Sequence, residues 1–110
     1  MKLEEAVRAI DQQIQVLTAI LQDTEAAIAA LKSLKEKGEG LVPVGAGVFI
    51  PVRVEEDRTL VNVGAGVFLE KNVDDAVSLL EKRKESVKKA LEQAKRQRIR
   101  LIEQARRVSK

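Results

Sequence analysis

Two of the side chains that most often carry out chemistry in proteins are missing from this chain. Its 110 residues include no cysteine and no histidine, which removes thiolate chemistry and the commonest general base and metal ligand near neutral pH. The serines therefore have no histidine to activate them; they are Ser33, Ser78, Ser86 and Ser109. We expect no catalytic residue, no metal site and no cofactor, and we predict that the protein is not an enzyme.

Two glycine-rich segments and one acidic segment could still bind ligands. Gly38-Glu-Gly40 and Gly45-Ala-Gly47 look like parts of phosphate-binding loops, but neither completes a Gly-x-Gly-x-x-Gly fingerprint or precedes Gly-Lys-Ser/Thr. Glu55, Glu56 and Asp57 could hold a cation, but they lack the spacing of a calcium loop. We favour a helix stop, a hairpin turn and a solvated turn as the interpretations of these segments.

Positive charge gathers in the last third of the chain. Residues 73–110 carry twelve Lys and Arg against six Asp and Glu, while the whole chain has a net charge of +3. Such a field attracts nucleic acids or acidic proteins. No aromatic residue lies among these cations to stack on bases. We therefore favour a solvated coiled-coil surface, then docking on an acidic protein, with nucleic acid as the least favoured partner.

The elements that would position these groups begin with a helix over residues 1–37. Its apolar residues are spaced alternately by four and three, which is the heptad pattern of a coiled coil. This predicted seam consists of Leu3, Val7, Ile10, Ile14, Leu17, Leu21, Thr24, Ile28 and Leu31. Gly38 and Gly40 are expected to end the helix.

A second helix is predicted over residues 73–108, with Asn72 or Asp74 as its cap. Its seam has the same spacing but includes two basic residues, and consists of Val73, Val77, Leu80, Lys84, Val87, Leu91, Ala94, Arg98, Leu101, Ala105 and Val108. If the two helices fold back antiparallel, Lys84 falls near Thr24 and Arg98 near Ile14. Polar residues in a seam can fix its register, which is the role we expect for these two.

The segment between the helices contains a repeat, because Val44-Gly-Ala-Gly-Val-Phe49 recurs as Val63-Gly-Ala-Gly-Val-Phe68. β-forming residues around paired glycines predict a strand, a turn and a strand. Residues 41–71 therefore predict two β-hairpins, with strands over 41–44, 48–54, 59–63 and 67–71. A two-stranded hairpin is marginally stable in water and exposes its edges, so another subunit is the natural cover.

With these motifs the whole chain resembles the alpha class of prefoldin subunits, of the archaeal type. The resemblance is carried by Leu41-Val-Pro-Val-Gly-Ala-Gly47, Val61-Asn-Val-Gly-Ala-Gly-Val67 and Glu70-Lys-Asn-Val-Asp-Asp-Ala-Val77. The beta class has one hairpin, so two hairpins indicate the alpha class. The implied fold is α+β: a long antiparallel coiled-coil hairpin of two helices with two β-hairpins inserted between them. The whole chain, 1–110, would form one prefoldin-like domain, and its hairpins would join an intersubunit β-barrel.

The resemblance implies an ATP-independent co-chaperone subunit that holds unfolded proteins at coiled-coil tips and passes them to a group II chaperonin. Its partners would be beta-class prefoldin subunits in a hexamer or copies of itself, sometimes in a filament, together with unfolded client proteins. The alternative is a structural homo-oligomer or filament assembled through the hairpins without client activity. No run of about 18 apolar residues is evident, so we expect a cytoplasmic protein without a membrane partner.

The resemblance also assigns site residues. The assembly residues would be Val42, Val44, Val48, Phe49, Ile50, Val52, Leu60, Val61, Val63, Val67, Phe68 and Leu69. The client-binding tip would consist of Leu3, Val7, Ile10, Leu101, Ile102 and Val108.

Overall fold

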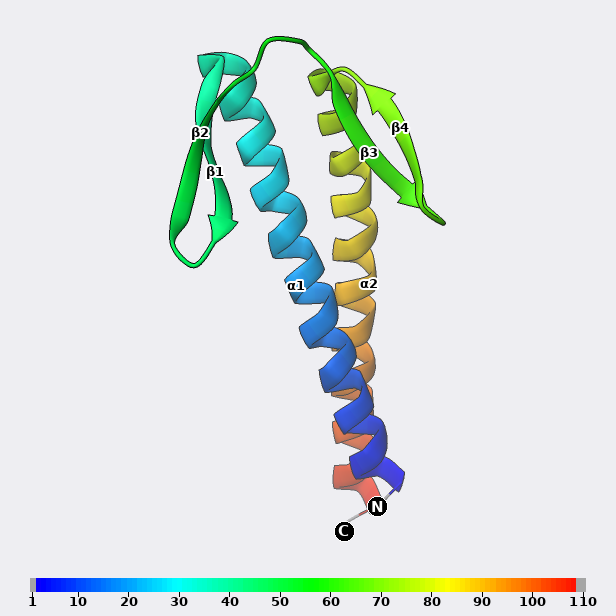
Figure 1. The fold of residues 1–110 in the computed structure, drawn as a ribbon. Coiled ribbons are helices and arrows are strands. Elements are labelled where there is room, and N and C mark those ends of the chain that lie inside the picture. The colour runs from blue at the N-terminus through cyan, green and yellow to red at the C-terminus, as the bar shows by residue number, and fades with distance from the viewer. Residues whose placement is uncertain (1, 109–110) are drawn as a thin grey trace. The chain divides into compact units, whose positions relative to one another are not determined.

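The computed structural model describes residues 2–108, except for the side chain of Val108. Its elements are α1 (Lys2–Lys37), β1 (Glu39–Gly45), β2 (Val48–Arg53), β3 (Thr59–Gly64), β4 (Val67–Lys71) and α2 (Val73–Val108) (Figure 1). The chain divides into two compact units, which we call the end unit (Met1–Thr24 with Arg83–Lys110) and the middle unit (Glu25–Lys82). The predicted plan of two long helices with two hairpins between them is confirmed.

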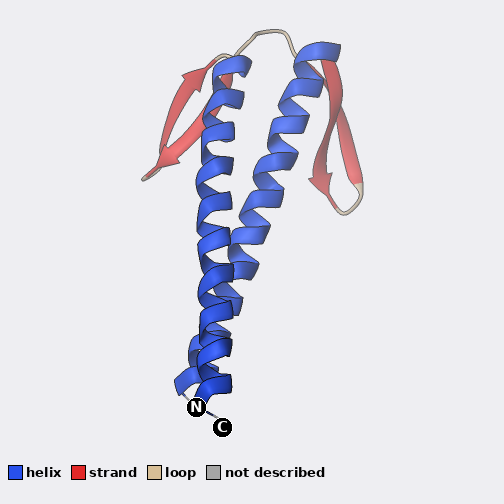
Figure 2. Cartoon of the chain, turned by 180° about the vertical axis from the view of Figure 1, so that it is seen from behind, coloured by secondary structure: helices blue, strands red, loops and turns tan. Residues whose placement is uncertain are grey.

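In the end unit the start of α1 lies beside the end of α2 (Figures 1 and 2). Leu91 and Ala94 are buried, and the seam residues of α1 from Leu3 to Leu21 are all partly buried. The heptad pattern therefore identified the packed stripe of each helix. Such a stripe stabilises a helix pair because it removes apolar surface from water.

One of the two basic seam residues, Arg98, differs from expectation in one detail. Arg98 Nε donates a hydrogen bond to Asp11 Oδ1 at 2.5 Å, so its charge lies one turn before the predicted neighbour, Ile14. The long stem of an arginine can cover apolar surface while its guanidinium reaches a carboxylate at the edge of the seam. The Thr24 hydroxyl donates to the carbonyl of Ile20 in its own helix, at 2.7 Å.

By length and composition alone, α1 is apolar enough to cross a membrane, which the sequence reading did not anticipate. This is weak evidence for a membrane span, since the core helix of a soluble protein passes the same test. The apolar residues of α1 recur with heptad spacing, and in the end unit they form the seam with α2. The structure accounts for this apolar character as a coiled-coil core.

In the middle unit, the helix ends are fixed by local hydrogen bonds. Gly38 has a φ of 72°, and its N–H donates to the Leu34 carbonyl at 2.8 Å, which is the left-handed cap expected at a helix end. Asn72 Oδ1 accepts from the Asp75 N–H at 2.8 Å, so Asn72 is the cap of α2. Asp74 instead forms an ion pair with Lys35 at 2.7 Å.

The two hairpins are separate antiparallel sheets, β1–β2 (hairpin 1) and β3–β4 (hairpin 2). Within the middle unit, hairpin 1 lies beside the end of α1 and hairpin 2 beside the start of α2 (Figures 1 and 2). β1 begins two residues earlier than predicted, and β2 ends one residue earlier. In both hairpins the register shifts by one residue before the turn, at Val44 and at Val63. Such an added residue is a β-bulge, which increases local twist.

The turns place alanine as well as glycine in the left-handed region. Ala46 and Gly47 have φ values of 51° and 78°, and Ala65 and Gly66 have 51° and 74°. Positive φ at both central residues is the requirement of a type I′ turn. Glycine meets it at low cost, whereas alanine loses roughly 1–2 kcal/mol because its Cβ crowds the following carbonyl.

Candidate functional site

The hairpins present a large apolar surface to solvent. Of the twelve predicted assembly residues, which we call the hairpin surface, all are exposed except Val52 and Val61, which are partly buried. Phe49 and Phe68, the only aromatic residues of the chain, are 55% and 56% exposed. Apolar patches of this kind commonly mark sites of protein interaction.

The structural match between the hairpins extends beyond the repeated hexapeptide. With an offset of nineteen residues, Leu41 and Val42 correspond to Leu60 and Val61, and Ile50 corresponds to Leu69. Leu41, which sequence reasoning left out of the assembly set, is 65% exposed. Each chain therefore carries two nearly equal apolar surfaces.

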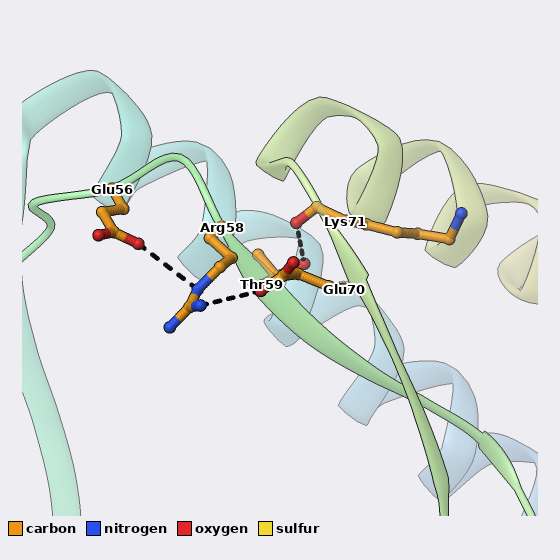
Figure 3. A network of polar contacts seen from close by, with 5 residues as sticks. All are labelled: Glu56, Arg58, Thr59, Glu70 and Lys71. Atoms are coloured by element: carbon orange, nitrogen blue, oxygen red, sulfur yellow. Dashed lines mark hydrogen bonds and ion pairs between the residues drawn. The ribbon is translucent and has the colours of Figure 1, made fainter.

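The base of hairpin 2 is held by polar contacts that the sequence did not predict. Asp57 Oδ1 accepts from the Val73 N–H at 2.8 Å, which ties the segment before β3 to the start of α2. The Thr59 hydroxyl donates to the Lys71 carbonyl at 2.8 Å. Arg58 pairs with Glu70 at 2.9 Å and with Glu56 at 3.5 Å (Figure 3).

These contacts change the interpretation of the acidic segment. We expected a solvated turn, but Asp57 is a backbone anchor and Glu56 faces a cation. Within residues 2–108 no group of three or more His, Cys, Asp or Glu side chains could hold a metal ion.

Hairpin 1 is attached differently. Its closing hydrogen bond runs from the Val54 N–H to the Gly38 carbonyl at 2.9 Å. Next to it, a Cβ added at Gly40 would lie 2.6 Å from Leu34 Cδ2. The absence of a side chain at position 40 therefore lets β1 approach the last turns of α1.

The predicted tip residues line two shallow grooves in the end unit. One groove, of about 440 Å³, includes Leu3, Val7 and Ile102. Its charged lining residues are Glu4, Arg8, Asp11 and Arg106. The other groove, of about 570 Å³, contains two apolar residues, Ile10 and Leu101. Val108 ends α2, but its side chain lies outside the described residues.

The grooves also have polar members that sequence reasoning missed. The larger groove is completed by Gln97, Arg100, Glu103, Gln104 and Arg107. These residues recur along α2 at the one-, three- and four-residue spacings of one helix face around Leu101, so helical spacing could have identified them. Both grooves combine aliphatic carbon with margins that carry charges of both signs.

Comparison with known proteins identifies the class of protein to which these elements belong. The profile of the prefoldin family, described as Prefoldin subunit, matches residues 3–110. The chain therefore belongs to the prefoldin family, whose members are chaperone subunits. This confirms the assignment made from the hairpin motifs.

Two individual proteins illustrate the similarity. Prefoldin subunit alpha of Thermofilum pendens (strain DSM 2475 / Hrk 5) is 32% identical over 89 residues, which cover 77% of this chain and 69% of that protein. A chain in the cryo-EM structure of filamentous PFD from Methanocaldococcus jannaschii has a TM-score of 0.78 and 24% identity, covering 97% of this chain and 92% of that chain. At this identity the second likeness shows the fold alone.

Proposed function

We propose that this protein is an ATP-independent chaperone subunit that holds unfolded proteins at the tip formed by the start of α1 and the end of α2. The observation that carries the proposal is the pair of grooves in the end unit, which combine exposed aliphatic side chains with charged margins. Unfolded chains expose apolar side chains that such grooves can bind.

The hairpin surface would join this subunit to others, either beta-class prefoldin subunits or further copies of itself. Its exposed Val, Leu, Ile and Phe side chains support this role, since burying them against a partner removes apolar area from water. The assembled protein would work in the cytoplasm and deliver its clients to a group II chaperonin. It would need no nucleotide, metal or cofactor.

Holding is tested by the aggregation of a denatured client, measured by light scattering at substoichiometric amounts of the protein. We expect the wild type to slow aggregation, and a variant with Leu3, Val7, Leu101 and Ile102 changed to Ser to lose most of this effect. Val16→Ser with Ile99→Ser is the matched control, because both residues are exposed aliphatics of the end unit that line neither groove. Equal loss in the control, or no holding by the wild type with or without a beta-class subunit, would reject the proposal.

Delivery to a chaperonin has a separate readout. A fluorescent client bound to the protein should move to a group II chaperonin when the two are mixed, which native gel electrophoresis can follow. If the client stays bound to this protein, the proposal of delivery to a chaperonin is wrong, and the proposal of client holding still stands.

A structural homo-oligomer or filament is the second candidate. It is favoured by the exposed hairpins and by the similarity to a chain of a filamentous prefoldin assembly. Mass photometry and electron microscopy of the protein, alone and mixed with a beta-class subunit, distinguish the candidates. Long fibres without any holding activity would favour this second function.

A further inference from the structure

In the end unit, one face of α2 carries only cationic and amide side chains. The seam with α1 lies on the other side of the helix, where Leu91 and Ala94 are buried. At about 3.6 residues per turn, the positions farthest from this seam recur at spacings of three and four. These positions, which we call the outer face, are Lys89, Gln93, Arg96, Gln97, Arg100, Gln104 and Arg107.

The side chains of the outer face are open to solvent. All seven are exposed. Among the residues that the structure describes, none of the four cations of this face forms an ion pair, whereas Arg98, nearer the seam, bonds to Asp11. The positive charge of the outer face is therefore available to a ligand.

The acidic side chains of α2 do not interrupt this face. Between residues 86 and 107 the acidic residues are Glu92 and Glu103, and helical spacing places both on the flank between the outer face and the seam. Four cations with no carboxylate among them produce a field of one sign, which attracts polyanions.

The spacing of the cations suits a ligand with regularly repeated negative charge. From Lys89 to Arg107 the helix rises about 27 Å, and the four cations are spread over this whole length. A nucleic-acid duplex carries one negative charge per about 1.7 Å of its axis, so a duplex lying along α2 presents a phosphate near every cation. The glutamine amides between the cations can also donate hydrogen bonds to phosphate oxygens.

We propose that the outer face of α2 binds the phosphate backbone of double-stranded nucleic acid, without reading its sequence. The missing aromatic residues made nucleic acid the least favoured partner in the sequence, but stacking on aromatic rings serves single strands. A duplex is bound through its phosphates, which need only cations and hydrogen-bond donors. A folded acidic protein normally needs a buried aromatic or apolar anchor as well, and the outer face contains none.

This activity is additional to client holding, although the two surfaces overlap in part. Four residues of the outer face also line the larger groove, namely Gln97, Arg100, Gln104 and Arg107. Lys89 and Arg96 line neither groove. Substitutions at these two positions therefore change the outer face without changing the proposed client site.

The test is fluorescence anisotropy of the full chain with a labelled DNA duplex of about 20 base pairs, which is longer than the outer face. Between about 50 and 200 mM salt, the logarithm of the binding constant should fall with the logarithm of the salt concentration, with a slope of about −3 to −4 for four phosphate contacts. Lys89→Gln with Arg96→Gln should bind at least about tenfold more weakly at low salt, and its slope should be about −2.

The matched control removes the same charge from the adjacent positions. Lys88→Gln with Lys95→Gln changes two exposed lysines that lie nearer the seam, so the binding constant should stay within about threefold of the wild type. Circular dichroism and the client aggregation assay check that both double variants keep their helices and their holding activity.

Three results would overturn the inference. Equal weakening by the two double variants would mean that net charge attracts DNA and that the outer face is not the site. No binding of the duplex by the wild type at about 50 mM salt would remove the activity. Displacement of the duplex by polyglutamate as effectively as by unlabelled duplex of equal charge would assign the face to acidic polypeptides. Each of these results leaves the proposed client holding standing, because holding is measured separately.

Discussion

Hairpin 1 and hairpin 2 have the same outer surface but different attachments. Both combine a bulge, a type I′ turn and the same run of exposed Val, Phe and Ile or Leu side chains. Hairpin 2 is anchored to the start of α2 by Asp57 and closed at its base by Thr59. Hairpin 1 approaches the end of α1 through the glycines at positions 38 and 40.

The difference shows that the repeat and its flanks have separate tasks. The repeated residues specify the same apolar surface and the same turn in both hairpins. The flanking residues that differ, such as Gly38 against Asp57 and Gly40 against Thr59, attach each hairpin in a different way. A comparison of matched variants in the two hairpins can therefore test each task on its own.

The largest expected effect comes from charging the shared surface. Phe49→Asp and Phe68→Asp each place a carboxylate where an apolar ring would be buried on assembly, which should weaken assembly by about 3 kcal/mol or more. Mass photometry should show a shift toward smaller species for both variants. Val16→Asp, on α1 outside the hairpins, is the control. A loss seen for only one phenylalanine would break the equivalence of the two surfaces.

The next effect concerns the anchor that hairpin 2 has and hairpin 1 lacks. Asp57→Ala leaves the Val73 N–H without its carboxylate at the first turn of α2, so the free energy of unfolding should fall by about 1–2 kcal/mol. Urea denaturation followed by circular dichroism measures it. The exposed neighbour Glu55 is the control, since Glu55→Ala should change stability by less than about 0.5 kcal/mol.

A smaller and opposite effect is expected at the turns, where the two hairpins agree. Asparagine tolerates the left-handed region better than alanine, so Ala46→Asn and Ala65→Asn should each stabilise the protein by about 0.5 kcal/mol. Thermal unfolding would detect an upward shift in the midpoint of similar size for both. Unequal shifts would mean that alanine costs a different amount of stability in the two turns, although their φ values match.

The smallest effect is the ion pair between Lys35 and Asp74 in the middle unit. The hydrogen bond to the Asp74 carboxylate raises the pKa of Lys35 above its ordinary 10.5. Stability from this pair is thus fully present below pH 10.5 and disappears as the pH rises through the raised pKa. The midpoints of thermal unfolding of the wild type and of Lys35→Met should therefore converge in strongly alkaline solution. A constant difference across that range would contradict the assignment.

The helices and hairpins could be predicted because their signals are local and periodic. Heptad spacing identified the seams from Leu3 to Leu31 and from Val73 onward, and the paired glycines located both turns. The bulges at Val44 and Val63, and alanine at positive φ, were missed because pairing across the whole hairpin imposes them. The contacts of Asp57 with Val73 and of Arg98 with Asp11 depend on residues far apart in sequence. No spacing rule encodes such pairs.

The order of the elements has a consequence during protein synthesis. Asp11 and Arg98 are 87 positions apart, so at about 5–20 residues per second the ribosome makes the partner of the α1 seam roughly 4–17 s after the seam itself. Until then the isoleucines and leucines of α1 are uncovered, while the hairpins can close within microseconds of their emergence. Ribosome-bound chains ending at residue 72 should thus be cleaved by protease within α1, and chains that expose all of α2 should be protected. A protein that we propose holds unfolded proteins would itself expose apolar surface in this way at every round of its own translation.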